Sequence, residues 1–366
     1  MDTLHPQKVL GLISGSSLDG VNAAIITIDG FDIFDFGLIS DIPYDDELRE
    51  KLQFAHKNYQ TIPNNEQKRL SNELTEFHTQ IVKEIQSSDT SKIDLIGFHG
   101  HTIVHKPEEH FILDIGDGQM LANSTGIKTV SRFRQSDILS GGQGAPLSSV
   151  YHQALSVSLP KPVVFVDIGG ISSLTWIGNN GEMLSFDIGP GNNIINDWVL
   201  KHSGQHMDYN GTLAALGNIH SEIVKQLLHH KFLAKHPPKA ADKSTFTEKS
   251  EHLEGLNLND GAATATQFIA EAIVYSIAFH LPEPPKLLVL CGGGALNPTL
   301  VRFIRRQLPE IEVKTSSDFN WHPQAIEAQA FAFLAARRIN LIPSSYSFTT
   351  GVPNACICGE VFIPQI

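Results

Sequence analysis

The chain has 366 residues, more than one ordinary hydrophobic core accommodates, so we expect two domains with room for a cleft between them. Its 39 acidic residues outnumber its 27 basic residues, and a formal net charge of -12 without a basic run argues against nucleic acid or an anionic membrane as a partner. The sequence has neither a signal-peptide pattern nor a run of about 18 apolar residues, so we expect a cytoplasmic protein.

The N-terminal part predicts strands followed by helices. Strands are expected over Lys8–Ile13, Val21–Ile28 and Phe31–Ile39, with tight turns between them. Apolar residues at helical spacing then predict helices over Asp45–His56 and Asn65–Ile85. The segments IDLIGF, FILDI and KTVSRF predict the strands that come next.

A second copy of the strand pattern begins at Val163. The strands VVFVDI, ISSLTWI and EMLSFDI are separated by turns at Gly169-Gly170 and Asn179–Gly181, which repeats the arrangement of the first three strands. The elements expected after this repeat are a helix after Gly191, helices over 218–230 and 262–280, the strand KLLVLC, a helix beyond Asn297 and a last helix over 324–338. Two copies of mixed strands and helices predict two related α/β lobes.

The repeat also suggests where the lobes divide. We expect an N-terminal lobe of residues 1–131 plus 335–366 and a C-terminal lobe of residues 132–334. Within the second lobe, the segment 236–250 is polar and rich in lysine, so we expect it to be a surface loop.

The turn GLISGSSLDG, from Gly11 to Gly20, directly follows the first strand. Gly15, Ser16 and Ser17 offer free backbone N–H groups and two hydroxyls where a bulky side chain would block an anion, so the turn can hold a phosphate. It lacks the Gly-Lys-Ser/Thr ending of a P-loop, and a strand rather than a helix follows it, which excludes the GxGxxG fingerprint. An ordinary Gly/Ser hairpin has the same pattern and remains an alternative.

Two later glycine clusters complement this turn. Asp167 ends a strand just before Gly169-Gly170, a setting that suits Mg²⁺ or a phosphate. In LCGGGALNP, the glycines 292–294 stand between a buried strand and a helix, where a flat ring or phosphate can approach the backbone. Each cluster alone is more typical of a tight turn. Together they match the phosphate-1, phosphate-2 and adenosine elements of the actin, Hsp70 and sugar kinase fold, which predicts that ATP binds.

A series of ordered motifs extends over most of the chain. They are GLISGSSLDGVNAA, GFHGHTIVHKP, LDIGDGQMLANSTGI, FRQSDILSGGQGAPL, VDIGGISSLT, FDIGPGNNIIND, LCGGGALNP and HPQAIEAQAFAFLAAR. In this order they resemble the anhydro-N-acetylmuramic acid kinase family. The resemblance implies an actin-like (ribonuclease H-like) fold of two α/β lobes with an internal duplication and a central cleft. It also implies a homodimer, ATP with Mg²⁺ as phosphoryl donor, and 1,6-anhydro-N-acetylmuramic acid as acceptor, giving N-acetylmuramic acid 6-phosphate.

The resemblance assigns the general base to Asp187. This residue ends an apolar strand directly before Gly189-Pro190-Gly191, so its carboxylate should face the cleft; a turn-capping Asp is the alternative. Asp19 follows the first turn and could order Mg²⁺ through water, although Asp before Gly is also a common turn residue. The residues expected to bind the nucleotide are Gly11, Ser14, Gly15, Ser16, Ser17, Asp19, Gly20, Gly169, Gly170, Gly189, Gly191, Asn192, Gly292, Gly293, Gly294 and Asn297.

Three further residues are expected on the sugar side. Arg134 could offer two N–H groups to the lactyl carboxylate of the substrate, or it could form a structural salt bridge. Glu327 matches a substrate contact of the family, but a Glu in a first helical turn also favours the helix dipole. His99 alternates with His101 and His105 at strand spacing, and because no carboxylate or Cys completes a metal set we expect cleft-lining or packing histidines.

This sequence departs from the usual family pattern at three positions. Ile188 stands where many members have Thr and would remove a hydroxyl beside the base; Arg132 replaces Asp, and Ser173 replaces Asn. These departures leave open a kinase of another anhydrosugar or of a hexose. A non-catalytic nucleotide-binding regulator of the same fold is a third possibility. The cysteines at 291, 356 and 358 form no CxxC pair and are expected to be reduced, buried thiols.

Overall fold

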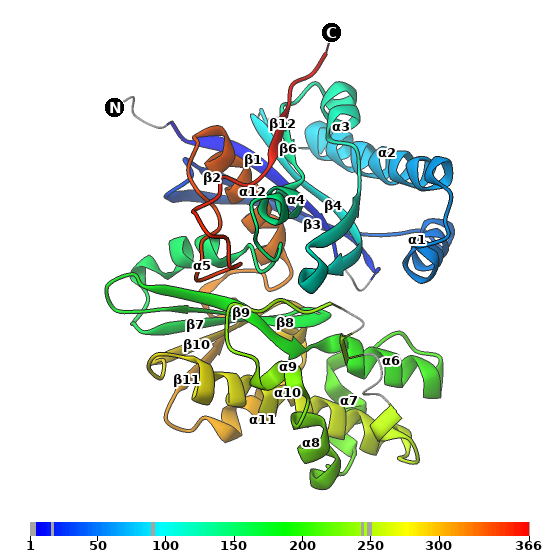
Figure 1. Cartoon of the computed structure of the whole chain (residues 1–366), viewed down its shortest axis with the longest axis vertical. Coiled ribbons are helices and arrows are strands. Elements are labelled where there is room, and N and C mark those ends of the chain that lie inside the picture. Colours follow the sequence, from blue (N-terminus) through cyan, green and yellow to red (C-terminus); the bar gives the residue numbers. More distant parts are fainter. Residues whose placement is uncertain (1–4, 16–17, 89–91, 243–244, 247–250, 366) are drawn as a thin grey trace. The chain divides into compact units, whose positions relative to one another are not determined.

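The computed structural model describes residues 5–15, 18–88, 92–242, 245–246 and 251–365. The chain divides into two compact units, which we call unit 1 (Met1–Leu155 with Ala325–Ile366) and unit 2 (Ser156–Gln324). Both units contain a mixed β-sheet with helices packed on it (Figure 1).

The division between the units differs from the predicted one at both boundaries. Helix α4 (Phe133–Leu139) packs beside strand β5 (Phe111–Ile115), and α5 (Ser149–Leu155) packs against α12 (Ala325–Ile339). Helix α12 in turn lies across the strands of unit 1. These contacts place the segments 132–155 and 325–334 in unit 1, because a helix belongs with the core on which its apolar face packs.

The sheet of unit 1 has the strand order β12-β6-β4-β1-β2-β3, and β5 pairs with β4 on a side path. Strands β1, β2 and β3 form an antiparallel meander with β3 at the edge, while β4 runs parallel to β1 and β6 parallel to β4. The other elements of this unit are β1 (Gln7–Ser14), β2 (Gly20–Ile28), β3 (Ile33–Pro43), β4 (Leu95–Lys106), β6 (Thr129–Ser131), β12 (Glu360–Phe362), α1 (Asp46–Asn58), α2 (Asn64–Ser88) and α3 (Gly118–Thr125).

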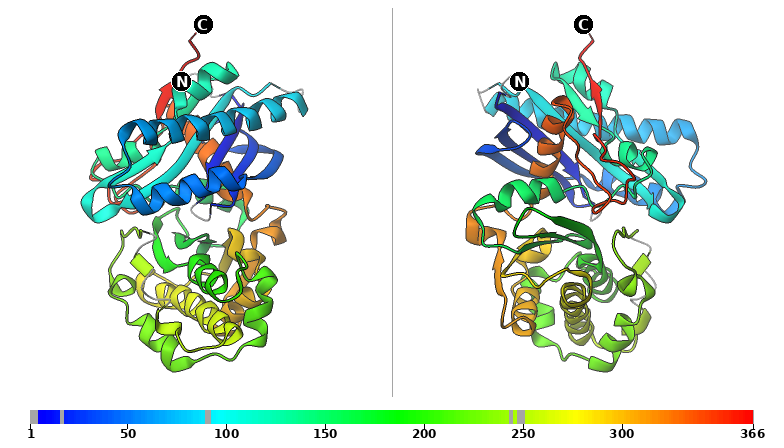
Figure 2. Two further views of the ribbon diagram at one scale, coloured as in Figure 1. Left: turned by 90° about the vertical axis from the view of Figure 1, so that its right-hand side faces the viewer. Right: turned by 60° about the vertical axis from the view of Figure 1, so that its left-hand side comes forward.

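The two faces of this sheet are covered by different helices. Leu10 and Leu12 of β1 pack in a core with apolar residues of α1 and α2. Gly11, between them, faces the other side, where α12 crosses β1, β2 and β4 (Figure 2). A Cβ atom added at Gly11 would lie 1.8 Å from the backbone oxygen of Ala328. The glycine therefore permits the close approach of helix and strand.

The sheet of unit 2 repeats the arrangement of unit 1. Its order is β11-β10-β7-β8-β9, in which β7, β8 and β9 form an antiparallel meander and β10 and β11 continue in parallel, as do β4 and β6 beside β1. The predicted α/β fold with an internal duplication is thereby confirmed. The elements are β7 (Val163–Ile168), β8 (Ile171–Ile177), β9 (Met183–Pro190), β10 (Leu287–Cys291), β11 (Glu312–Thr315), α6 (Asn192–Ser203), α7 (Thr212–Leu216), α8 (Ser221–Leu228), α9 (Lys231–Ala234), α10 (Leu258–His280) and α11 (Pro298–Gln307).

One face of the second sheet forms the core of unit 2. Ile168, Leu174 and Ile188 are fully buried there against apolar residues of α6, α10 and α11. Helix α10 is long and apolar enough to cross a membrane, but most of it is buried against the neighbouring helices of this unit. Its composition is that of a core helix. The three cysteines are free and buried, as expected from the sequence.

Replacement of Gly11 by Ala tests the packing of α12 on β1. We expect Gly11→Ala to lower the free energy of unfolding by about 3 kcal/mol, because the new methyl group overlaps the backbone of Ala328 and neither element can move independently. Gly169→Ala is the control, since the nearest atom to its Cβ would be 3.5 Å away. Equal midpoints of urea unfolding for both variants would show that the predicted overlap is absent.

Candidate active site

The first phosphate turn in unit 1 lies between β1 and β2. The N–H of Leu18 donates to the oxygen of Gly15 over 3.2 Å, which closes the turn, and Asp19 is exposed just after it. The predicted phosphate contacts Ser16 and Ser17 lie outside the described residues. Gly20 is needed for packing, because a Cβ atom there would lie 2.0 Å from the oxygen of Ile42.

Gly11 and Gly20 are thus explained by strand and helix packing rather than by a phosphate. Sequence reasoning assigned both to the nucleotide because it treated the whole ten-residue motif as one cradle. Of the described motif residues, Gly15 and Leu18 close the turn itself, and Asp19 follows it exposed.

Ser14, at the end of β1, belongs to a buried polar network. Its hydroxyl accepts a hydrogen bond from the Tyr44 hydroxyl and shares another of 2.7 Å with Nδ1 of His101, whose Nε2 lies 2.8 Å from Nε2 of His56. Burial raises the pKa of Tyr44, so the phenol stays protonated and remains a donor. These bonds fix the strand end from which the predicted phosphate turn starts.

In unit 2, the second glycine turn meets the start of α6. The N–H of Asn192 donates to the oxygen of Gly169 over 2.8 Å. Gly191 allows this approach, because a Cβ atom there would lie 2.4 Å from the same oxygen. The turn after β7 is therefore held against a helix N-terminus, which is an environment that favours anions.

The late glycine cluster adjoins the same place. A Cβ atom at Gly292 would lie 2.3 Å from Oδ1 of Asp167, so the carboxylate at the end of β7 packs directly on this glycine. Asn192 connects the elements: its Nδ2 donates to the oxygen of Ile168 over 3.0 Å, and its Oδ1 lies beside Gly294.

Two of these glycines could carry a Cβ atom without overlap. The nearest atoms to an added Cβ are 3.5 Å away at Gly169 and 3.6 Å away at Gly293. We call Gly169, Gly191, Asn192 and Gly293 the nucleotide cradle, because Gly169 and Gly293 leave room beside the N-terminus of α6, which Gly191 and Asn192 form. The sequence placed these clusters far apart, and the fold brings them together within unit 2.

Two predicted nucleotide contacts have structural roles instead. The side-chain oxygen of Asn297 caps α11 by accepting from the N–H groups of Thr299 and Leu300 at 3.1 and 3.0 Å. Gly189 gives room to Phe246, whose ring would lie 2.8 Å from an added Cβ. The motifs that contain Asn297 and Gly189 therefore also specify local structure, namely a helix N-cap and close packing of an aromatic ring.

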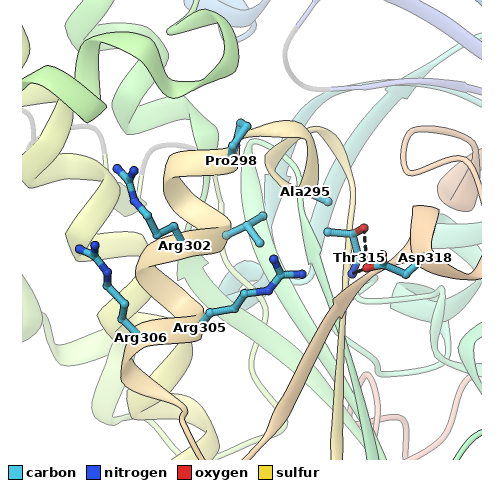
Figure 3. Close-up of a pocket in the computed structure, with 8 residues that line it drawn as sticks. Ala295, Pro298, Arg302, Arg305, Arg306, Thr315 and Asp318 are labelled. Atoms are coloured by element: carbon cyan, nitrogen blue, oxygen red, sulfur yellow. Dashed lines mark hydrogen bonds between the residues drawn. The ribbon is translucent and has the colours of Figure 1, made fainter.

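A pocket of about 540 Å³ follows the late glycine cluster, and its size is typical of small-ligand sites. Figure 3 shows Arg305 pointing toward Thr315 and Asp318, whereas Arg302 and Arg306 extend to the other side of α11. The remaining lining residues are Ala295, Pro298 and Val301.

Asp187 lies on the face of the second sheet opposite the unit 2 core. In the register it pairs with Ser173, which also pairs with Asp167, so the three side chains form a row across β9, β8 and β7. Both carboxylates are nearly buried, with 5% exposure for Asp187 and 6% for Asp167. Oδ2 of Asp187 accepts from the N–H of Ala241 over 2.8 Å. This hydrogen bond fixes the orientation of the Asp187 carboxylate. It joins the carboxylate to a distant segment rather than to the turn that follows Asp187.

Ala241 belongs to the segment 236–250, which the sequence predicts to be a surface loop. This prediction is wrong for residues 239–241. Lys239, Ala240 and Ala241 are buried, and the oxygen of Lys239 accepts from the N–H of Asp187 over 2.9 Å. The residues around Lys-Ala-Ala are mostly polar, and this composition predicts an exposed segment. Two small residues after Pro237-Pro238 were the available signal of close packing.

The three departures from the family pattern have different consequences. The side chain of Ile188 points into the unit 2 core, so the expectation that it removes a hydroxyl beside the base is wrong. Arg132 forms an exposed ion pair of 2.7 Å with Glu360. Ser173, by contrast, is partly exposed and lies between the two carboxylates, so it is the departure that changes the site.

In unit 1, the residues predicted for the sugar lie together. Nε of Arg134 donates to Nε2 of His99 over 2.8 Å, and its Nη1 donates to the oxygen of Gly144 over 2.9 Å. Burial and the charge of Arg134 hold the pKa of His99 well below its usual value, so this ring is a neutral acceptor. Burial raises the pKa of Glu327, and the attraction of Arg134 opposes the rise.

Sequence reasoning missed Asp114, which lines a polar pocket of about 350 Å³ together with His99. Burial raises the pKa of Asp114 to about 6, although the Thr102 hydroxyl donates to it over 2.6 Å and Arg134 attracts it. The motif LDIGDGQM by itself predicts no role for its first carboxylate. The spacing of Asp114 from Arg134 gave no signal.

The remaining histidines do not form a metal set. Nε2 of His105 lies 2.6 Å from the oxygen of Gln143, and His101 belongs to the Ser14 network. Among the described residues, no group of three His, Cys, Asp or Glu side chains could hold a metal ion.

Comparisons with known proteins agree over almost the whole chain. Residues 7–364 match the family model described as anhydro-N-acetylmuramic acid kinase. A protein of that name from Paramagnetospirillum magneticum is 39% identical over 359 residues, covering 97% of this chain and 99% of its own, and one from Acidiphilium cryptum is 37% identical over 358 residues, covering 97% and 98%. Among solved structures, the ADPNP-bound activator of 2-hydroxyisocaproyl-CoA dehydratase from Clostridium difficile has a TM-score of 0.46 at 14% identity, covering 92% of this chain and 96% of its own.

The nucleotide cradle is tested by filling its free room. We expect Gly169→Val to weaken the binding of Mg-ADP about tenfold or more, because the new side chain enters the room proposed for a phosphate, while its Cβ lies 3.5 Å from the nearest atom, the oxygen of Ile171. The thermal midpoint should stay within about 2 °C of the wild type. Isothermal titration calorimetry measures the affinity, with Gly169→Ala as the smaller step in the series. An unchanged Kd in the valine variant would place the nucleotide elsewhere.

Proposed function

The chain belongs to the anhydro-N-acetylmuramic acid kinase family and is an ATP-dependent sugar kinase, and on this premise we propose how its residues act. The acceptor is 1,6-anhydro-N-acetylmuramic acid, a product of cell-wall turnover, and the product is N-acetylmuramic acid 6-phosphate. The observation that carries the proposal is the Asp187 carboxylate, which is nearly buried and held by a backbone hydrogen bond beside Asp167.

The reaction requires a base at carbon 1 of the sugar. Asp187 accepts a proton from water, whose oxygen bonds to carbon 1 while the bond from carbon 1 to oxygen 6 breaks. Oxygen 6 then forms its bond to the γ-phosphorus of ATP, and ADP leaves. A carboxylate fixed by Ala241 N–H suits the role, because its orientation is set before the substrate binds.

We assign the phosphates of ATP to the nucleotide cradle of unit 2, at the N-terminus of α6. The pocket that begins at Ala295 is the candidate for the adenosine end, since its lining starts one residue after Gly294.

Mg²⁺ is expected with ATP, and two carboxylates fit it. Asp19 is exposed at the end of the first turn, and Asp167 stands just before Gly169. Asp167 is the candidate in unit 2 and Asp19 the separate candidate in unit 1, each holding the ion through water, which is the usual arrangement for Mg²⁺ at nucleotide sites. When bound, the ion neutralises charge on the phosphates.

On the sugar side, Arg134 is the candidate for the lactyl carboxylate. Its bonds to His99 and Gly144 fix the plane of the guanidinium, which has five N–H groups in all. Glu327 and Asp114, whose pKa values are raised by burial, are candidates for hydrogen bonds to sugar hydroxyls.

We also infer a cytoplasmic location and a homodimer. ATP is a cytoplasmic donor, and the family resemblance implies two subunits. Sedimentation equilibrium measures the second inference directly, and a monomer at micromolar concentration would contradict it.

Replacement of the proposed base tests the mechanism. We expect Asp187→Asn to fold and to bind Mg-ATP with a Kd within about twofold of the wild type, while kcat falls about a thousandfold or more, because the amide cannot accept the proton of water. Glu182→Gln at the far end of the β8–β9 hairpin is the matched control and should keep wild-type turnover. ADP release with 1,6-anhydro-N-acetylmuramic acid is the readout.

Two outcomes would change the proposal. Wild-type turnover in Asp187→Asn would remove Asp187 from the role of base. Turnover by the wild-type protein with a hexose, but none with the anhydrosugar, would favour the kinase of another acceptor.

A further inference from the structure

Lys239 is a fully buried lysine in unit 2. None of its surface is exposed, and its ammonium donates to the oxygens of Phe232 and Leu233 at 3.1 and 3.0 Å. Nζ also lies 3.4 Å from Nε2 of His280 and 5.5 Å from the ring centre of Phe186. The ammonium is therefore enclosed by carbonyl oxygens and aromatic rings at the end of α9.

Burial of a lysine opposes folding, because its charge loses water. This desolvation lowers the pKa of Lys239 to about 8, and the negative charge of Asp187 raises it again in part. The other charged or titratable groups around it are Lys235, which lowers the pKa, His280 on α10, and His236 beside that ring.

The backbone of Lys239 reaches the proposed base directly. Its oxygen accepts the N–H of Asp187 over 2.9 Å, and two residues later the N–H of Ala241 donates to Oδ2 of Asp187 over 2.8 Å. The segment 239–241 thus holds Asp187 by its backbone and by its side chain. We call the segment 239–241 the clamp. Because the side chain of Lys239 donates hydrogen bonds to α9, its ammonium connects the clamp to the rest of unit 2.

Building on the proposed function, we propose that Lys239 is the positioning residue of the base. Its hydrogen bonds to α9 fix the segment that orients the Asp187 carboxylate, and its positive charge favours the ionised form of that carboxylate. Lys239 acts through Asp187 and does not need to touch the substrate. Nothing in the motif HPPKAA indicates this, because a lysine beside two prolines is typical of a surface turn.

A purely structural lysine would explain the bonds to α9 but not an effect on the base. Lys161 is the matched control, because its Nζ also donates to a backbone oxygen of unit 2, that of Ser156, over 2.9 Å. Its partner lies outside the clamp. Lys161→Met therefore removes a similar bond while it leaves Asp187 and its segment intact.

The experiment compares Lys239→Met with Lys161→Met. We expect Lys239→Met to lower kcat about tenfold to a hundredfold with KM for ATP within about twofold, since binding of the nucleotide does not depend on the base. Wild-type turnover should fall as the pH rises through about 8, where Lys239 loses its proton, and Lys239→Met should lack this decline. Lys161→Met should show the wild-type kcat and pH profile.

A second measurement does not depend on the reaction. Hydrogen exchange followed by NMR should show about tenfold lower protection of the Asp187 and Ala241 amides in Lys239→Met, and no change in Lys161→Met. If Lys239→Met does not fold, Lys239→Gln replaces it in both experiments with the same expected direction. The exchange result remains decisive if the wild-type protein does not use the anhydrosugar, which would contradict the proposed function alone.

Wild-type kcat and amide protection in the Lys239 variant would overturn the proposal. An equal loss of protection in Lys161→Met would do the same, because the effect would then be general to the unit.

Discussion

The hydrogen bond from the Ala241 backbone to the Asp187 carboxylate is the contact on which the proposed chemistry depends. It holds a nearly buried carboxylate in one orientation at the end of β9, on the face of the sheet that does not form the unit 2 core. Side chains alternate between the two faces of β9, so Ile188 packs in the unit 2 core while Asp187 lies on the opposite face. A general base needs this fixed orientation more than it needs exposure.

The fold could be predicted from the sequence because its signals are local and occur twice. The hairpins after Lys8 and Val163 have turn residues at matching places, and the strand order in both units follows from them. The unit boundaries were not predictable in the same way. Helix α12 comes last in the chain and packs on strands from its beginning, a long-range contact that leaves no mark in local sequence patterns.

In the candidate site too, some features could be predicted from local sequence and others could not. The glycine clusters of unit 2 could be recognised from the sequence as turns after strands, and the structure brings them together around Asn192. The motifs alone could not distinguish a glycine that contacts a ligand from a glycine that allows another backbone segment to pack closely. Gly11 is of the second kind, because helix α12 packs on it. Nor could the motifs locate Lys239, because burial of a lysine depends on carbonyl oxygens supplied by α9. These distinctions require the three-dimensional packing around each residue.

The central claim is that this kinase activates water at carbon 1 while it phosphorylates oxygen 6. The most direct measurement is incubation with Mg-ATP and 1,6-anhydro-N-acetylmuramic acid in water enriched in oxygen-18, followed by mass spectrometry of the product. A control with unlabelled product in the same water corrects for spontaneous exchange at carbon 1. We expect one heavy oxygen at carbon 1 and phosphate at carbon 6. A phosphorylated product that retains the anhydro ring, or one without label at carbon 1, would contradict the claim.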